Sequence, residues 1–286
     1  MFSTASDLAT LGRSILSSSL LAPEITRAWL KPVTGTADLR LSVGMPWEIR
    51  RMELPLTESL NTTRPATRIV DLYTKNGDLG SYTTFFVLSP DHRFGYSILL
   101  ASPVADTTTR NVEAGILSQL MADTLVPAFE EAARQQAKTN FAGTYASTDT
   151  DNVTTTLSLI VEEGKAGLGV STWTRNQVDL LQMFALVSGI PLEYAPSLRL
   201  YPMGLESNGQ KAFRGVYEAL PVAGGNGIAT EMSHGVFTGG CLSWGAVDTP
   251  QYGNVGFDDF VFDVDEKGAA VAVTPRVMRK TLSKHT

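Results

Sequence analysis

The spacing of apolar residues changes near residue 139, and this change limits the folds open to the chain. Over residues 109–138, apolar side chains recur at helical intervals and predict one long helix with a single apolar face, formed by Val112, Ile116, Leu117, Leu120, Met121 and Leu125. After Phe141 the chain holds only short alternating runs separated by glycine-rich turns. The sequence therefore predicts two domains, 1–138 and 139–286, with the polar stretch Arg134–Asn140 as their linker.

The first domain is predicted to combine helices with an antiparallel sheet. Thr4 or Ser6 is suited to cap a first helix, and Pro23 to begin a short second helix that runs through Trp29. Four β-like runs follow, at residues 47–52, 66–74, 81–88 and 94–101. The last two runs are joined by the polar turn Ser89–Arg93. We expect the long helix to pack its apolar face against this sheet.

The second domain is predicted to be rich in β-structure. Its short apolar runs lie at residues 154–161, 168–173, 198–201, 212–217, 241–247, 260–264 and 269–273. Short strands separated by glycine-rich turns are typical of a β-barrel or a β-sandwich. The fold class of the whole chain is therefore α+β.

Composition excludes several function classes. The chain of 286 residues is 43% hydrophobic and 18% charged, which argues against a disordered protein. Its net charge of −6 argues against a nucleic-acid partner. No apolar run reaches the length of a membrane span. These properties predict a soluble globular protein.

The single cysteine and the first residues bear on the cellular compartment. Cys241 alone excludes an internal disulfide framework and a multi-cysteine zinc site. The residues after Met1 show no signal peptide, so the chain as written is expected to be cytoplasmic, and secreted if a signal-bearing segment precedes it. The triplets that begin at Asn61 and Asn152 fit the N-glycosylation pattern, which matters only for a secreted chain.

Few residues have the spacing that a metal or cofactor site requires, and we expect no cofactor. His92 and His285 are expected to be solvated surface groups, whereas His234 is a weak candidate for a functional role. An acidic cluster would suit calcium in principle, but its members alternate with apolar residues and are expected on the solvent face of a strand: Asp258, Asp259, Asp263, Asp265 and Glu266.

The most informative stretch is Lys75-Asn76-Gly77-Asp78, at the end of a predicted strand, which resembles the Lys-Thr/Ser-Gly triad of serine β-lactamases and penicillin-binding proteins. The roles that follow are those that this resemblance implies. A lysine supplies positive charge for a substrate carboxylate or for tuning a nearby proton acceptor. Glycine allows a substrate to approach the backbone closely. The backbone N–H of Asp78 would then point into an oxyanion position. We take these four residues as the candidate catalytic site, with Lys75 expected at a strand edge and directed into a cleft.

Other segments of the chain resemble the same family, the serine β-lactamases and penicillin-binding proteins. Segment 2–13 resembles the Ser-Thr/Ala-x-Asp-Leu-Ala helix of that family, and segment 89–96 resembles the hairpin after the triad. Phe141–Tyr145 and the run 241–254 resemble the small β-domain of fungal β-lactamase-like proteins. The chain is identified as a member of the fungal serine β-lactamase-like hydrolases. The resemblance implies the C-terminal part of a β-lactamase/transpeptidase-like domain followed by a small β-domain.

The chain also departs from the family pattern. The resemblance requires a Ser-x-x-Lys nucleophile and a Tyr-x-Asn or Tyr-x-Ser motif upstream of Lys75, and neither is present there. Thr281–Lys284 and Tyr252–Asn254 match in spelling, but they lie downstream, in the wrong order. Asn76 replaces the usual Thr or Ser. Without a nucleophile, this stretch cannot form an acyl-enzyme by itself.

Three functional hypotheses follow. The first is an acyl-transfer hydrolase for a small-molecule ester or amide substrate, whose missing half of the domain is supplied elsewhere. The second is an inactive relative that serves as an accessory or binding protein. The third is an unrelated lectin-like β-domain, which would require that the first half lack its strand–helix packing.

Overall fold

The computed structural model describes residues 3–56, 67–102, 107–187, 195–220 and 244–285. It divides into two compact units, Met1–Ala133 and Arg134–Thr286, each described by itself below. Among the residues so described, no helix has both the length and the apolar character needed to cross a membrane.

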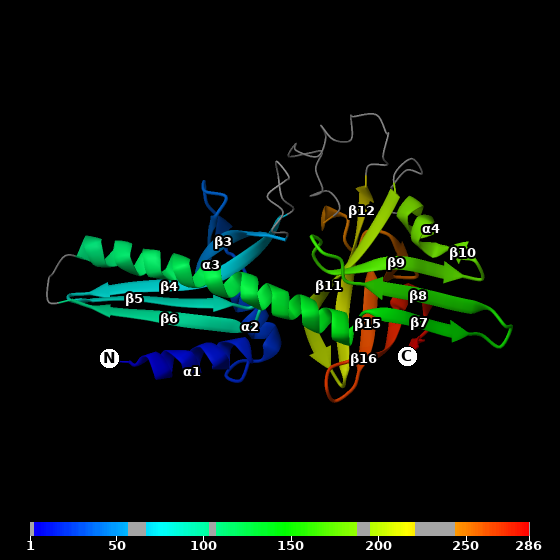
Figure 1. Cartoon of the computed structure of the whole chain (residues 1–286), viewed down its shortest axis with the longest axis horizontal. Coiled ribbons are helices and arrows are strands. Elements are labelled where there is room, and N and C mark those ends of the chain that lie inside the picture. Colours follow the sequence, from blue (N-terminus) through cyan, green and yellow to red (C-terminus); the bar gives the residue numbers. More distant parts are fainter. Residues whose placement is uncertain (1–2, 57–66, 103–106, 188–194, 221–243, 286) are drawn as a thin grey trace. The chain divides into compact units, whose positions relative to one another are not determined.

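The first unit is built on a six-stranded antiparallel sheet whose strands follow their order in the chain (Figure 1). The strands are β1 (Thr34–Gly35), β2 (Leu41–Val43), β3 (Glu48–Pro55), β4 (Thr67–Leu79), β5 (Tyr82–Ser89) and β6 (Phe94–Ala101). The last four correspond to the four predicted runs. Leu79 and Tyr82 flank the turn between β4 and β5, in which Gly80 adopts a positive φ of 56°.

Three helices accompany this sheet: α1 (Ala5–Leu16), α2 (Pro23–Trp29) and α3 (Thr107–Asn140). Thr4 caps α1 through a capping box with Asp7, and Pro23 begins α2, as the sequence predicts. The predicted linker Arg134–Asn140 is wrong, because these residues form the last turns of α3.

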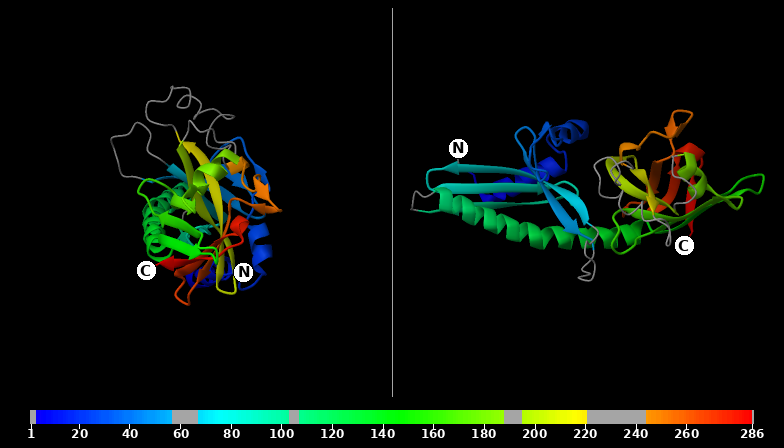
Figure 2. Two further views of the ribbon diagram at one scale, coloured as in Figure 1. Left: turned by 90° about the vertical axis from the view of Figure 1, so that its right-hand side faces the viewer. Right: turned by 90° about the horizontal axis from the view of Figure 1, so that it is seen from above.

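Helices α3 and α1 lie on opposite faces of the sheet (Figure 2), and the two faces carry different apolar clusters. On one face, sheet residues that include Val70 and Val87 pack with Ala122 and Val126 of α3. On the other face, Ile15 of α1 packs in a buried cluster with Trp47, Ile49, Tyr73 and Leu88. Because successive strand residues point to opposite faces, one sheet serves both helices.

The predicted apolar face of α3 does not match the observed one. The buried positions are Arg110, Ala114, Ala122 and Val126, whereas five of the six predicted residues are exposed by 39–58%: Val112, Ile116, Leu117, Leu120 and Met121. The expectation that the long helix packs on the sheet is confirmed, and the predicted face is wrong.

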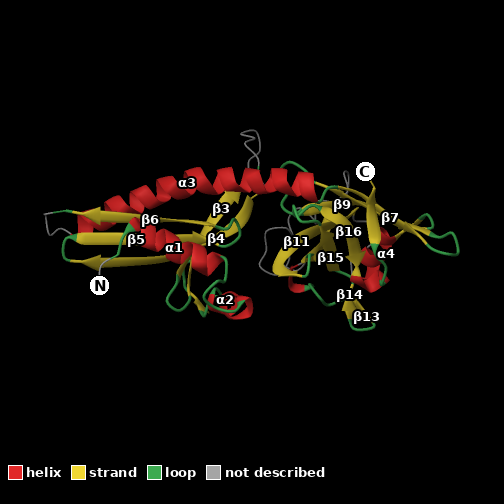
Figure 3. Ribbon diagram, turned by 90° about the horizontal axis from the view of Figure 1, so that it is seen from below, coloured by secondary structure: helices red, strands yellow, loops and turns green. Residues whose placement is uncertain are grey.

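The second unit is a closed antiparallel barrel, in which the strands are ordered β9–β11–β12–β15–β16–β17–β7–β8 and β8 returns to β9 (Figure 3). The strands are β7 (Gly143–Thr148), β8 (Thr154–Ile160), β9 (Leu168–Arg175), β11 (Ala195–Ser207), β12 (Gln210–Leu220), β15 (Asp259–Val264), β16 (Ala270–Pro275) and β17 (Leu282–His285). Closure pairs every one of these strands on both sides, so the prediction of a barrel or sandwich resolves as a barrel.

Smaller elements decorate the barrel: β10 (Val178–Asp179), α4 (Leu180–Val187), β13 (Gln251–Tyr252), β14 (Val255–Gly256) and η1 (Arg276–Met278). The barrel interior is filled by a core that includes Trp173, Phe260 and Phe262. The strand predicted at 241–247 is wrong over 244–247, which forms a helical turn, and its first three residues lie outside the described residues.

Candidate functional site

The four predicted site residues lie where β4 loses one of its neighbours. The pairing of β3 with β4 stops at Glu48 opposite Thr74, whereas the pairing of β4 with β5 continues to Leu79. From Lys75 onward, no described strand pairs with the β3 side of β4. Lys75–Asp78 therefore forms a strand edge whose outer side is open to another backbone.

Lys75 and Asn76 converge on a single carboxylate. The Lys75 Nζ atom donates to Glu48 Oε1 at 2.7 Å. In the amide orientation that satisfies both groups, Asn76 donates to the same Glu48 oxygen at 2.7 Å. The Lys75 side chain is 47% exposed, so this ion pair adds little stability but holds a cation beside the strand edge.

Among the described residues, nothing requires a glycine at position 77. The φ of Gly77 lies outside the left-handed region, and an added Cβ would meet only Thr84 Oγ1, at an ordinary contact distance of 3.4 Å. Thr84 also donates to the carbonyl of Gly77 at 3.2 Å. Glycine weakens a strand by about 0.5–1 kcal/mol, so its presence here lowers the stability of β4 rather than raising it.

Asp78 is tied to the hairpin and to the start of α3. Thr83 Oγ1 donates to Asp78 Oδ1 at 2.6 Å. This hydrogen bond and one from Asn111, with a lesser contribution from the charge of Arg110, hold the pKa of the Asp78 carboxyl below its ordinary value, although desolvation acts to raise it. Buried Arg110 donates to the carbonyl of Gly80 at 2.5 Å, which fixes the hairpin tip on α3.

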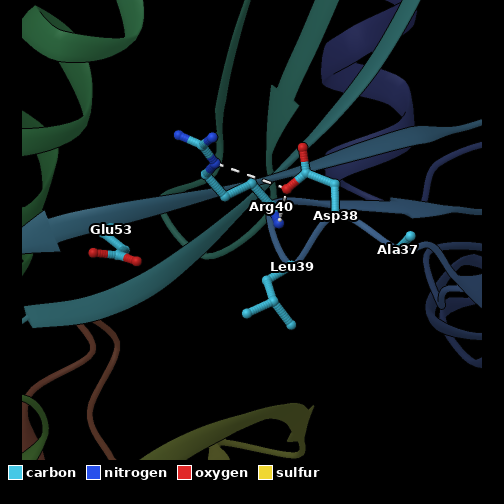
Figure 4. Close-up of a pocket in the computed structure, with 5 residues that line it drawn as sticks. All are labelled: Ala37, Asp38, Leu39, Arg40 and Glu53. Atoms are coloured by element: carbon cyan, nitrogen blue, oxygen red, sulfur yellow. Dashed lines mark hydrogen bonds and ion pairs between the residues drawn. The ribbon is translucent and has the colours of Figure 1, made fainter.

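One pocket, of about 660 Å³, lies at the β1–β2 connection and β3, and none of the predicted site residues lines it (Figure 4). The expectation that Lys75 faces a cleft stays a prediction. The walls of this pocket are Ala37, Asp38, Leu39, Arg40 and Glu53. Leu39 is 90% exposed and Arg40 pairs with Asp38 at 3.8 Å, so the pocket is an open depression without a convergent set of polar groups.

A Ser–His–Glu series occurs elsewhere in the first unit. Ser89 Oγ lies 2.9 Å from His92 Nδ1, and His92 Nε2 lies 2.8 Å from Glu130 Oε2. The expectation that His92 is solvated is wrong, because its side chain is 2% exposed. Ser89 is fully buried, so its hydroxyl cannot reach a substrate. The series instead joins the β5–β6 turn to α3.

We expect Glu130→Gln to destabilise the chain by about 1.5–3 kcal/mol at pH 7, since Glu130 accepts charge-assisted hydrogen bonds. Burial alone would raise the pKa of this carboxyl, but His92 and Arg68, whose Nε lies 3.1 Å away, hold the pKa below its ordinary value of 4.5. The stabilisation is therefore present above pH 4.5 and is lost as the pH falls through the lowered pKa.

Urea denaturation of the wild type and Glu130→Gln at pH 7 and at pH 3 measures this effect. The gap between the two proteins should narrow at the lower pH. Glu113→Gln, on the exposed side of the same helix, is the matched control and should change little. A gap that stays constant with pH would contradict the assigned role of the ionised carboxylate.

The other candidate residues named in the sequence belong to the second unit or lie outside the described residues. Asp258 is not on a solvent face, since it is 2% exposed and pairs with Arg214 at 3.1 Å. Within the described ranges, no group of three or more His, Cys, Asp or Glu side chains could hold a metal ion. Thr281–Lys284 and Tyr252–Asn254 both belong to the barrel unit. His285 is exposed, as expected. Three further residues singled out in the sequence lie outside the described residues: Asn61, His234 and Cys241.

Sequence reasoning missed three residues that organise the site: Glu48, Thr83 and Arg110. Glu48 lies 27 positions before Lys75, and only the register of β3 brings the two together. Arg110 was not predicted to be buried, because the apolar periodicity used to find the buried face of a helix does not include a cation. No motif marks any of the three.

Comparison with known proteins assigns the chain to a class. A family model described as "Beta-lactamase-like-like, C-terminal domain" matches residues 133–286, which is more than half of the chain. The chain therefore belongs to the beta-lactamase-like family. The matched region corresponds closely to the barrel unit, Arg134–Thr286.

Three fungal relatives show the same relationship. A "Beta-lactamase-like protein" of Arthroderma benhamiae is 29% identical over 95% of this chain and 46% of its own length. The "Probable hydrolase M10" of a Phoma species is 27% identical over 63% of this chain and 27% of its own length. The "Beta-lactamase-like protein str6" of Strobilurus tenacellus is 26% identical over 59% of this chain and 50% of its own length.

The chain thus spans half or less of the length of these relatives. No solved structure shows a significant match to this chain.

Proposed function

We propose that the first unit is the C-terminal part of a β-lactamase/transpeptidase-like domain, and that β4 supplies the substrate-contacting edge of a serine acyl hydrolase. The nucleophile would come from a segment of the kind that the longer relatives carry and this chain does not match. The observation that carries the proposal is the open edge of β4 at Lys75–Asp78, next to an exposed cation.

The hairpin geometry supports a role for the Asp78 amide. In an antiparallel ladder, successive residues direct their N–H groups to alternate sides. Leu79 and Tyr82 flank a two-residue turn and are expected to face each other across the hydrogen-bonded ladder. Asp78, one residue earlier, then directs its amide toward the unpaired side of β4. This position suits a donor to a developing oxyanion.

Lys75 and Gly77 have different roles in the proposed acyl transfer. Lys75 would attract the carboxylate or polar group of a small ester or amide substrate. Its contact with Glu48 would then be replaced by a contact with the substrate. Gly77 leaves room for that substrate along the strand. The proposed reaction needs no metal or organic cofactor, because a serine nucleophile, an adjacent base and an oxyanion donor suffice.

The second candidate is an inactive accessory or binding protein. The ion pair between Lys75 and Glu48 favours it, because Glu48 satisfies the cation that a substrate would otherwise contact. The two candidates differ in whether a complementary segment restores acyl transfer.

An acylation experiment tests the proposal. The chain alone should show no labelling by a fluorophosphonate or penicillin probe. A fusion of the full chain to the unmatched part of the Arthroderma relative should be labelled on a serine of that part, and Lys75→Ala should reduce the acylation rate by roughly 10²-fold. Labelling of the chain alone would contradict the proposal, and a folded but unlabelled fusion would favour the accessory protein.

The substitution Gly77→Ala tests whether Gly77 is needed for acylation rather than for folding. We expect the free energy of unfolding of the chain to change by less than about 1 kcal/mol, because the added Cβ has room. In the same fusion, acylation should fall at least about tenfold if substrate lies along this edge. Gly115→Ala, where the Cβ also meets open space, should leave acylation unchanged. Equal rates for both variants would remove Gly77 from the site.

A further inference from the structure

The outward side of α3 carries a continuous row of apolar side chains, called here the α3 apolar stripe. Its members are exposed by 58%, 56%, 42%, 58% and 39%, in the order Val112, Ile116, Leu117, Leu120 and Met121. Residues three and four positions apart are neighbours on a helix surface, so these five side chains form one patch. Contiguous exposed apolar patches of this kind mark interaction sites.

The stripe is not the face with which α3 packs on its own sheet. That face is formed by Arg110, Ala114, Ala122 and Val126, all buried. The helix therefore has two apolar faces, and within the described residues only one of them is covered. A helix that is apolar on two sides is typical of the middle of a packed layer.

The charges beside the stripe indicate what could cover it. Glu113 and Asp123 flank it, and residues 111–129 contain no lysine or arginine. A second copy that packed antiparallel on the stripe would bring Glu113 of one chain opposite Asp123 of the other. Like charges disfavour this pairing. A helix with an apolar face and basic flanks is the complementary partner.

The length of the relatives indicates where such a helix would come from. The Arthroderma relative aligns with 95% of this chain, yet the alignment covers only 46% of that relative. We propose that the α3 apolar stripe docks an amphipathic helix with basic flanks, which belongs to the part of the polypeptide that the longer relatives carry and this chain does not match. This inference rests on the proposed function, in which that part supplies the nucleophile.

Peptide binding tests the inference without requiring catalysis. Overlapping peptides of about 20 residues, a length that spans the stripe as a helix, should tile the unmatched part of the Arthroderma relative. Fluorescence anisotropy should detect binding of at least one peptide with an apolar face and basic flanks to the full chain. The variant Ile116→Glu/Leu120→Glu should weaken that binding at least tenfold.

Two controls keep the result interpretable. Ile25→Glu/Leu39→Glu changes apolar residues of the same unit that are 53% and 90% exposed, and it should bind the peptide as the wild type does. Because all four positions are exposed, both double variants should retain the circular dichroism spectrum and melting temperature of the wild type.

Three outcomes would overturn the inference: no tiled peptide binds, binding is equally strong in the Ile116→Glu/Leu120→Glu variant, or the chain alone forms a dimer in analytical ultracentrifugation that this variant abolishes. The last outcome would assign the stripe to a second copy. Binding at the stripe together with an unlabelled fusion would support the docking site and overturn the acyl-transfer proposal alone.

Discussion

Phe262→Ala should lower the free energy of unfolding of the barrel unit by about 3–5 kcal/mol. Phe262 is fully buried, and its ring centroid lies 4.8 Å from that of Phe213, 5.2 Å from that of Phe141 and 6.1 Å from that of Tyr145. Rings from four segments meet in the barrel, so the cavity left by the missing ring cannot close by moving one side chain. The loss is comparable to a large part of the stability of an ordinary domain.

Urea denaturation of the full chain, followed by tryptophan fluorescence, measures this change because Trp173 lies in the same core. Tyr252→Ala is the matched control in the same unit, since Tyr252 is 68% exposed, and it should cost less than about 0.5 kcal/mol. A loss below about 1 kcal/mol for Phe262→Ala would show that the aromatic cluster does not hold the barrel together.

The two units should behave very differently when they are expressed separately. Fragment 134–286 should melt cooperatively as a monomer, because its barrel is closed by the pairings of β17 with β7 and of β8 with β9. Fragment 1–133 should bind a dye specific for apolar surface and should associate. Its exposed apolar side chains include the α3 apolar stripe and, elsewhere, Leu20, Ile25, Val33 and Met45.

Burial of apolar surface contributes about 25 cal/mol per Å², so a few hundred Å² left uncovered forgo several kcal/mol of stabilisation. Thermal melts, dye fluorescence and light scattering on both fragments test this prediction. A fragment 1–133 that melts cooperatively, remains monomeric and binds no dye would show that the first unit is a self-sufficient fold. It would also remove the main reason to expect a docked partner.

The assignment of residues to local elements could largely be predicted from the sequence. Thr4 with Asp7, and Pro23, set the starts of α1 and α2 through backbone hydrogen bonding and fixed φ angles, which are local properties. Strands β3 to β6 of the first unit were predicted from their β-like runs, whereas the short strands β1 and β2 were not. The short strands β7 and β17 were missed, although their pairing helps to close the barrel.

The errors arose where distant residues changed the environment of a side chain. Arg134–Asn140 is polar, yet it continues α3, where Ala137 packs on the barrel core. His92 and Asp258 are buried because Glu130 and Arg214, far away in the chain, provide charged partners. The charge and hydropathy of a residue predict its exposure only where no such partner compensates its burial.

The sequence by itself determined the family resemblance, the sites of the main turns and caps, and the identity of Lys75–Asp78 as the candidate stretch. Only the tertiary structure decided that this stretch is a strand edge beside Glu48, because that result depends on where β3 ends against β4. It also decided which face of α3 packs on the sheet. Apolar residues occupy both sides of that helix, so the sequence alone does not select a side, whereas the packing of Ala122 and Val126 with residues of the sheet does.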